Sequence, residues 1–228
     1  MTRIGLVYDR IRWEEKALIR VAKRMGLDLK VVDSKGIYID ALGDADSTKE
    51  FFGDIVMQRC ISYFRGLHIA AALENKGIKV INPFSVSMIC GNKLYTTLAL
   101  VKAGVPVPKT LIAFTNEGAM KAIETLGYPT VMKPVVGSWG RLVALLKDRD
   151  SARAIIESRR EMRNALLQIY YLQEYVRRPP RDIRILVIGD EVIAASYRYS
   201  PKGDWRTNVA RGGMSKPCPI TEDISEIA

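Results

Sequence analysis

Residues 127–141 read GYPTVMKPVVGSWGR, and this stretch decides how we interpret the fold. The run from Pro129 to Val135 predicts a strand that contains Lys133, and a second strand is predicted at Leu142–Lys147. Glycines between the strands allow backbone N–H groups to approach an anion, and the lysine adds a positive charge suited to phosphate. The pattern is neither a Walker A motif nor a dinucleotide-binding fingerprint, because no Gly-Lys-Ser/Thr opens a helix there. An ordinary hairpin turn remains the alternative.

A strand of similar character follows at 171–176, where the sequence reads YLQEYV. The backbone of such a strand can contact the edge of a nucleobase, although the stretch read alone is also an ordinary strand. Residues 183–188 and 192–199 flank Gly189-Asp190 and predict an antiparallel hairpin. Two arginines on its arms can clamp a phosphate or carboxylate, or can form a solvated basic face: Arg184 and Arg198.

Other basic residues lie close to the hairpin in sequence. Arg177 and Arg178 stand beside two prolines, and we interpret both as surface residues. Residues 206–213 read RTNVARGG, a loop whose donors can bind an anion; a flexible surface loop is the alternative. Asp150 is the predicted N-cap of a helix that runs to Asn164, where arginines alternate with glutamates. That mixture favours a solvated face or a docking surface for an acidic protein over a contact with nucleic acid.

The N-terminal third alternates predicted strands and helices, which favours a parallel sheet covered by helices and therefore an α/β fold. Asn82-Pro83 predicts a domain boundary, because the residue before a proline is disfavoured in helices. We expect strands at 3–8, 29–32, 55–57 and 79–81, and helices at 13–25, 62–75, 85–103 and 116–126.

Composition narrows the function classes. Of the 228 residues 48% are hydrophobic, which supports a sizeable core and argues against disorder. His68 is the single histidine, which excludes a multi-histidine metal site and argues against a Ser-His-Asp mechanism. Scattered cysteines (Cys60, Cys90 and Cys218), with no signal peptide or transmembrane run, lead us to expect a cytoplasmic protein. The net charge of +10 predicts an anionic partner.

Five segments, in this order, resemble the ATP-grasp superfamily and, within it, the RimK/LysX branch. They are GNKLYTTLALVKAGVPVPKT at 91–110, GYPTVMKPVVGSWGR at 127–141, YLQEYV at 171–176, RDIRILVIGDEVIAASYR at 181–198 and TNVARGG at 207–213. The branch contains the amino-group-carrier-protein ligases of lysine and arginine biosynthesis, which are relatives of the ribosomal-protein glutamate ligase. The resemblance spans essentially the whole chain, and GSWGR, RDIR and TNVARGG together are specific to the carrier-protein ligases.

The resemblance implies an ATP-grasp fold in three parts. A Rossmann-like (pre-ATP-grasp) domain is expected over 1–83, a central α+β subdomain over 84–170, and a C-terminal α+β subdomain over 171–228. Members of the family continue with an acidic strand and a Glu-x-Asn pair that binds magnesium, and no such pair occurs near Ala228. We therefore expect the last subdomain to be incomplete and the magnesium ligands to lie beyond residue 228.

The implied cofactors are ATP and Mg²⁺. In this family two lysines hold the ATP phosphates, a small loop closes over them, a strand contacts the adenine, and a carboxylate lies near the ribose. The matching residues are, in that order, Lys93 and Lys133; Gly137, Ser138 and Gly140; Gln173, Glu174, Tyr175 and Val176; and Asp182.

The hairpin and the loop after it match positions that handle the substrates. Arg184 and Arg198 correspond to positions near the transferred phosphate and the acyl group, and we expect both to be catalytic. The amino acid is expected to contact Arg198 together with the loop residues Asn208, Gly212 and Gly213.

The implied activity is that of an ATP-dependent ligase. It joins the α-amino group of 2-aminoadipate or glutamate to the C-terminal glutamate of a small acidic carrier protein through an acyl phosphate. The two amino acids differ by one methylene, worth only about 1–3 kcal/mol in a pocket, so the sequence does not choose between them. The resemblance also implies a homo-oligomer, and neither a membrane nor nucleic acid is expected as a partner. A protein glutamate ligase like RimK and a non-catalytic nucleotide-binding protein are the alternatives.

Overall fold

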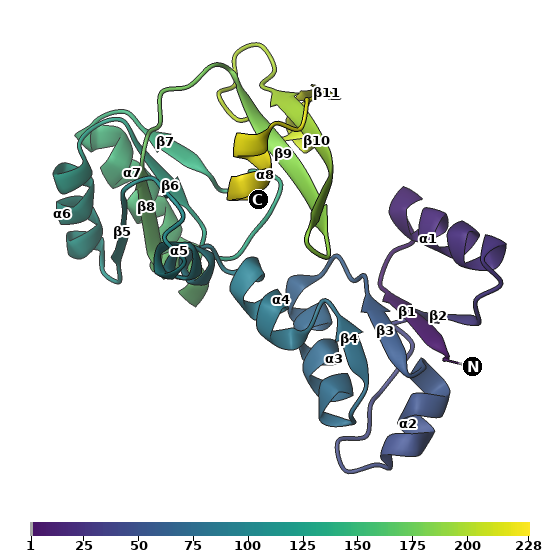
Figure 1. Ribbon diagram of the computed structural model, residues 1–228. Helices are drawn as coiled ribbons and strands as arrows, with labels where there is room; N and C mark the ends of the chain where they lie inside the picture. Colours follow the sequence, from purple (N-terminus) through teal and green to yellow (C-terminus); the bar gives the residue numbers. More distant parts are fainter. Residues whose placement is uncertain (1) are drawn as a thin grey trace. The chain divides into compact units, whose positions relative to one another are not determined.

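The computed structural model describes residues 2–228, and the chain forms two compact units, Met1–Gly91 and Asn92–Ala228 (Figure 1). None of the helices in the described residues combines the length and the apolar character that crossing a bilayer requires. The cleft described below belongs entirely to the second unit.

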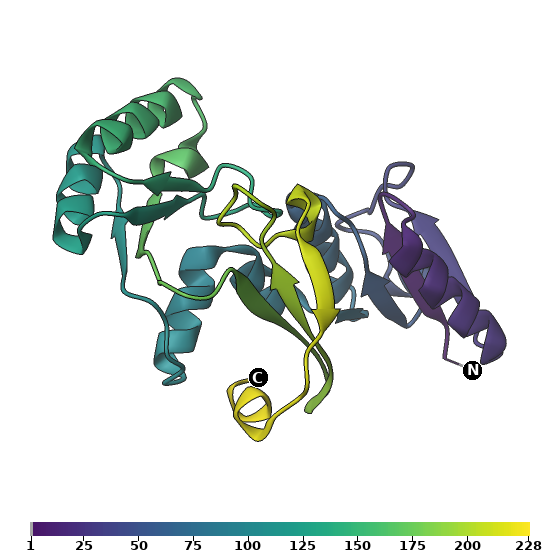
Figure 2. The same cartoon turned by 90° about the horizontal axis from the view of Figure 1, so that it is seen from above.

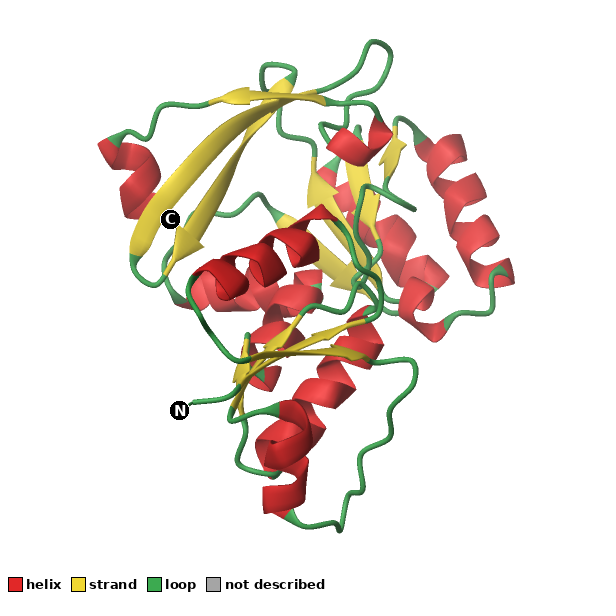
Figure 3. Ribbon diagram, turned by 90° about the vertical axis from the view of Figure 1, so that its right-hand side faces the viewer, coloured by secondary structure: helices red, strands yellow, loops and turns green. Residues whose placement is uncertain are grey.

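The first unit is built on a parallel sheet in the order β2-β1-β3-β4, as the alternation of strands and helices predicted. Helix α1 covers one face of this sheet, and α2 and α3 cover the other (Figure 3). The core between the sheet and α2 and α3 includes Val7, Val56 and Leu73, whose side chains are fully buried. The elements are β1 (Ile4–Tyr8), α1 (Trp13–Arg24), β2 (Leu29–Asp33), α2 (Ala45–Phe52), β3 (Ile55–Gln58), α3 (Tyr63–Asn75), β4 (Lys79–Ile81) and α4 (Phe84–Gly91).

Helix α2 lies in a segment for which the sequence predicted no element. It begins where the Asp44 carboxylate accepts a hydrogen bond from the Ser47 amide at 2.7 Å. It ends at Phe52, whose ring is buried in the core of the first unit. One N-cap and one buried ring therefore stabilise this short helix.

The single helix predicted over 85–103 is wrong, because the chain forms two helices there, α4 and α5 (Lys93–Lys102). Asn92 separates them with an extended backbone (φ −119°, ψ 118°), and its side chain accepts a hydrogen bond from the Leu94 amide at 2.9 Å. An asparagine N-cap ends one helical register and starts another, which hydrophobic periodicity does not reveal.

The second unit contains an antiparallel sheet in the order β5-β8-β6-β7, which we call the central sheet. Helices α6 and α7 cover its outer face (Figure 2). The N-cap of α7 is Asp148 and not Asp150 as predicted, because Asp148 accepts a hydrogen bond from the Ser151 amide at 2.8 Å. The elements are β5 (Thr110–Ala113), α6 (Asn116–Leu126), β6 (Thr130–Lys133), β7 (Ala144–Leu146), α7 (Arg149–Glu161) and β8 (Tyr170–Glu174).

A second antiparallel sheet follows, in the order β11-β10-β9. The predicted hairpin is confirmed as β9 (Arg181–Ile188) and β10 (Glu191–Tyr199). Strand β11 (Met214–Pro217) was not predicted, since its serine, lysine and proline have little strand propensity. Helix α8 (Glu222–Ile227) follows it.

The three-part division predicted from the sequence stays a prediction, but the structure groups two elements differently. Helix α4, which follows the predicted boundary at Asn82-Pro83, belongs to the first unit, where the Tyr63 hydroxyl of α3 donates to the Met88 carbonyl at 3.4 Å. Strand β8 was expected in the C-terminal part, yet it pairs with β5 and β6 in the central sheet. Strand pairing therefore places the residues of β8 on the same surface as Lys133.

Candidate functional site

Strand alternation gives the central sheet two different faces. Met132 on β6 and Tyr170 and Leu172 on β8 point toward α6 and α7 and are buried there. Their neighbours along the strands point to the opposite face, because successive side chains in a strand alternate. Those neighbours include Lys133 and Gln173, which line an open cleft.

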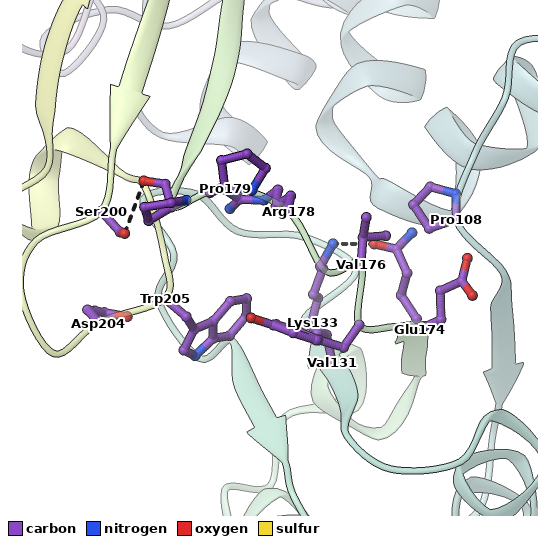
Figure 4. A pocket seen from close by; sticks show the side chains of 13 residues that line it. Pro108, Val131, Lys133, Glu174, Val176, Arg178, Pro179, Ser200, Asp204 and Trp205 are labelled. Carbon is purple, nitrogen blue, oxygen red and sulfur yellow. Dashed lines mark hydrogen bonds between the residues drawn. The ribbon is translucent and has the colours of Figure 1, made fainter.

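The cleft consists of two adjoining cavities of about 480 and 290 Å³, both lined by Lys133, Arg178 and Trp205. The larger cavity is shown in Figure 4 and is also lined by Pro108, Val131, Gln173, Glu174, Tyr175, Val176, Pro179, Pro180, Ser200 and Asp204. The smaller cavity is also lined by Lys93, Gly137, Ser138, Trp139, Gly140, Val143, Arg206, Thr207 and Asn208.

Lys133 is held in the cleft by a chain of polar side chains. Its Nζ donates to Gln173 Oε1 at 2.5 Å (Figure 4), and Gln173 Nε2 donates to Thr110 Oγ1 at 3.0 Å and to the Tyr171 hydroxyl at 3.1 Å. The Tyr171 hydroxyl in turn lies 2.8 Å from Thr97 Oγ1. Gln173 thus uses both ends of its amide to fix the lysine, and strands β5, β6 and β8 all contribute to its placement.

Burial, together with the nearby charge of Lys93, lowers the pKa of Lys133 to about 8. Burial also lowers the pKa of Lys93, whose Nζ donates to the Gly137 carbonyl at 2.8 Å. Two ammonium groups in one partly desolvated cleft, without a carboxylate hydrogen-bonded to either Nζ in residues 2–228, form a site suited to an anion.

We call residues 134–143, between β6 and β7, the glycine loop. Trp139 (φ 60°), Gly140 (φ 66°) and Leu142 (φ 55°) all have a left-handed backbone, which glycine adopts freely and the other two residues do not. A Cβ at Gly140 would lie 2.6 Å from Asn208 Oδ1, so this glycine permits close approach of the loop to Asn208.

We call residues 200–213, between β10 and β11, the arginine loop. Arg206 forms a fork on Asp204, with Nε 2.9 Å from Oδ1 and a terminal nitrogen 2.9 Å from Oδ2, and Arg211 Nε donates to the same carboxylate at 3.1 Å. These hydrogen bonds, Arg206 foremost, hold the pKa of Asp204 well below its usual range. The other terminal nitrogen of Arg206 donates to the carbonyls of Gly140 at 3.4 Å and Val143 at 3.3 Å, which joins the two loops.

Arg198 and Asp182 form a bidentate pair across β9 and β10, with distances of 2.8 and 2.7 Å. Burial opposes the ionisation of Asp182, but the hydrogen bonds from Arg198 and Thr207 outweigh it, so the pKa of this carboxyl lies below its ordinary value. Arg184 is exposed and lies on the same face of the hairpin, opposite Ser196. Neither arginine lines the two cavities.

The structure brings together most of the residues that the sequence assigned to the ATP site. Nine of the ten residues predicted for ATP line the cleft: Lys93, Lys133, Gly137, Ser138, Gly140, Gln173, Glu174, Tyr175 and Val176. Asn208, which was predicted to contact the amino acid, lines it as well. The other five do not line it: Asp182, Arg184, Arg198, Gly212 and Gly213. Close packing accounts for the glycine at position 213, since a Cβ there would lie 2.8 Å from the carbonyl oxygens of Thr207 and Tyr199.

Sequence reasoning missed several cleft residues. Arg178, interpreted as a surface residue, lines both cavities because the chain turns back over the cleft after β8. Trp205, for which the sequence suggested no role, lies edge-on to Tyr175 with ring centroids 6.0 Å apart. The only available signal was the position of these residues beside segments already assigned to the site.

Within residues 2–228 no group of three or more His, Cys, Asp and Glu side chains is arranged to hold a metal ion. Two carboxylates hydrogen-bond to residues that line the smaller cavity, Asp182 and Asp204, and both are already paired with arginines. The described residues therefore do not provide a magnesium site.

Two antiparallel sheets that enclose a cleft with half-buried lysines and a glycine loop define an ATP-grasp protein. The crystal structure of a RimK domain ATP-grasp protein from Sphaerobacter thermophilus shares this fold at a TM-score of 0.72 and 26% identity, over 86% of this chain and 72% of that one. The chain belongs to the RimK-like ATP-grasp family: residues 90–228 match the RimK-like ATP-grasp domain, and residues 4–89 match the LysX preATP-grasp domain.

Two curated relatives come from Sulfurisphaera tokodaii. The chain is 40% identical to its alpha-aminoadipate–LysW ligase LysX over 99% of this chain and 78% of the relative. It is 35% identical to the glutamate–LysW ligase ArgX of the same organism over 98% of this chain and 78% of the relative. Identity at this level over nearly the whole chain makes these proteins homologues of the chain.

Proposed function

We propose that this chain is an ATP-dependent ligase that joins the α-amino group of 2-aminoadipate or glutamate to the C-terminal glutamate of a small acidic carrier protein. The observation that carries the proposal is the convergence of Lys93, Lys133 and the glycine loop on one cleft beside residues 173–176. The two S. tokodaii relatives are named as ligases of these two amino acids to LysW, which supports the substrate class.

The cleft offers different surroundings to the two ends of ATP. Pro108, Val131 and Val176 line the larger cavity and give the adenine apolar contacts. Lys93 and Lys133 line the smaller cavity, where their charges attract the phosphates. ATP therefore binds with its base in the larger cavity and its phosphates toward the glycine loop.

The reaction consists of two displacements. A carboxylate oxygen of the carrier protein attacks the γ-phosphorus, the bond to the bridging oxygen breaks, and ADP leaves an acyl phosphate behind. The uncharged amino group then attacks the acyl carbon, the bond to the phosphate oxygen breaks, and the nitrogen loses its proton to give an amide and inorganic phosphate. No side chain has to form a covalent intermediate, in keeping with a cleft lined by cations and without a cysteine or histidine.

Positively charged side chains stabilise the negative charge that develops in both steps. Lys93 and Lys133 offset the negative charge of the transferred phosphoryl group. We propose that Arg184 and Arg198 act near the transferred phosphate and the acyl group, and that Arg198 also contacts the amino acid, as the sequence predicted. Asp182 holds Arg198 by two hydrogen bonds and so limits its orientation. The net charge of +10 also favours encounter with an acidic carrier protein.

The proposal is tested by the intact mass of an acidic carrier protein after incubation with the full-length enzyme, ATP, Mg²⁺ and one amino acid. We expect an increase equal to one residue of aminoadipate or of glutamate, and no increase when ATP is left out. The amino acid that adds faster identifies the preferred substrate. An unchanged mass with both amino acids contradicts the proposal.

The pKa of Lys133 predicts how ATP affinity depends on pH. The protonated lysine binds phosphate, so affinity is expected to be steady near pH 7 and to fall as the pH rises through about 8. The limiting slope is about tenfold per pH unit. Calorimetric titration between pH 7 and 9.5 measures this.

Lys133→Arg is the matched control, because an arginine stays protonated throughout that range. We expect a flat profile for this variant. An equally steep fall in Lys133→Arg would assign the pH dependence to another group.

A further inference from the structure

Arg159, on α7, is a buried cation that the sequence analysis did not assign to the site. Its residue is only 3% exposed, whereas its neighbour Arg160 is exposed. Within residues 2–228 no carboxylate forms an ion pair with Arg159. Burial lowers its pKa to about 10, which shows that the surroundings disfavour the charge. An unpaired buried charge costs folding free energy, so its contacts require an explanation.

The contacts of Arg159 are with the two ends of the glycine loop. One terminal nitrogen donates to the Leu142 carbonyl at 2.8 Å, and the other lies 3.5 Å from the Lys133 carbonyl. Lys133 is the last residue before the loop, and Leu142 lies near its other end in a left-handed conformation that is unfavourable for leucine. Arg159 therefore contacts both ends of the loop from the side on which α7 lies.

Other cations hold three further carbonyls of the same loop. Arg206 donates to the carbonyls of Gly140 and Val143, and Lys93 donates to that of Gly137. A carbonyl oxygen facing a phosphate would repel it, and a carbonyl bound to a guanidinium is not free to do so. Both arginines hold the end of the loop next to β7, and Arg159 also contacts the Lys133 carbonyl at its other end.

We propose that Arg159 is a positioning residue for the phosphates: it fixes both ends of the glycine loop with the carbonyls of Lys133 and Leu142 turned away from the nucleotide. The inference deepens the proposed function, because it rests on ATP binding in this cleft. Arg159 itself touches neither the nucleotide nor the reacting atoms. Its effect is transmitted through the conformation of the loop.

The test compares ATP with adenosine, which lacks the phosphates that the loop contacts. In Arg159→Met we expect ATP affinity to fall by about 10- to 100-fold, the value of charge-assisted hydrogen bonds, with adenosine affinity unchanged. Arg159→Lys is expected to recover part of the loss, because a lysine can hold one of the two carbonyls. Arg160→Met removes the same charge from an exposed position of the same helix and should behave like the unmodified chain.

Each outcome separates the two proposals. Unchanged ATP affinity in a folded Arg159→Met variant overturns the positioning role, and so does an equal loss of ATP and adenosine, which would indicate a general structural defect. If circular dichroism shows that Arg159→Met does not fold, Arg159→Lys decides the question by the same comparison. Failure of the unmodified chain to bind ATP would instead reject the proposed function, and with it the inference.

Discussion

Replacing Lys133 with methionine is expected to lower kcat/KM for ATP by about 100- to 1000-fold, the cost of removing one preorganised charge from a transition state. Lys133 is held in place in the cleft, since Gln173 fixes its Nζ and Thr110 and Tyr171 fix Gln173. Methionine fills a similar volume but offers no charge. Steady-state kinetics with ATP as the varied substrate measure the effect.

The same variant is expected to unfold at a higher temperature than the unmodified chain. Burial and the charge of Lys93 depress the pKa of Lys133 to about 8, so the protonated lysine destabilises the fold at neutral pH. The unfolded chain holds this proton more tightly, and the penalty disappears only as the pH rises toward the ordinary lysine pKa of 10.5. A large loss of activity together with a raised melting temperature would exclude misfolding as the cause.

Lys147→Met is the matched control for Lys133→Met. Lys147 is exposed just after β7, and the same change there should leave both kcat/KM and the melting temperature nearly unchanged. Normal turnover by a folded Lys133→Met variant would remove this lysine from the proposed mechanism.

Those parts of the site that lie on regular strands could be predicted from the sequence. The alternation in β6 and β8 separates Met132 and Leu172, which face the helices, from Lys133 and Gln173, which face the cleft. The local sequence pattern is enough to predict which face of the sheet a side chain occupies, because successive residues of a strand point to opposite faces. The glycine loop was found for a similar reason, since it joins two strands.

Contacts between loops could not be predicted, because nothing local specifies them. Arg206 reaches the Gly140 and Val143 carbonyls across more than sixty positions of sequence, and Trp205 meets Tyr175 only once both loops are folded. Asn92 illustrates a different limit, in which one capping side chain overrides the apolar periodicity of the surrounding segment. In such segments the hydrogen bond of a single side chain determines where a helix ends, and the spacing of apolar residues gives no information on that bond.

The second large effect is expected in the first unit, at the buried carboxylate of Glu15. This side chain has no exposed surface and accepts hydrogen bonds from Arg12 at 2.7 and 3.0 Å and from Arg59 at 3.1 Å. It also accepts from the Arg12 amide at 3.0 Å, which closes a capping box at the start of α1. Glu15 therefore connects the first turn of α1 to the segment after β3.

Glu15→Gln is expected to lower the stability of the first unit by about 2–4 kcal/mol at pH 7. The range lies below that of a fully buried pair, because the side chains of Arg12 and Arg59 remain 33% and 37% exposed and water screens part of the interaction. Glu14→Gln is the control, since Glu14 is half exposed and makes only one long contact, 3.7 Å, with Arg12. Urea unfolding followed by hydrogen exchange of residues 4–8 reports on this unit.

The contribution of Glu15 is also expected to depend on pH. The hydrogen bonds from Arg12, and then those from Arg59, outweigh burial and lower the pKa of Glu15 from 4.5 to about 2. A carboxyl with a depressed pKa stabilises the fold fully above the unfolded value and loses that contribution as the pH falls through the folded value. The stability difference between the unmodified chain and Glu15→Gln should therefore be constant above about pH 5 and shrink between pH 4.5 and 2. A difference that persists undiminished at pH 2 would mean that lost packing, and not lost charge, destabilises the variant.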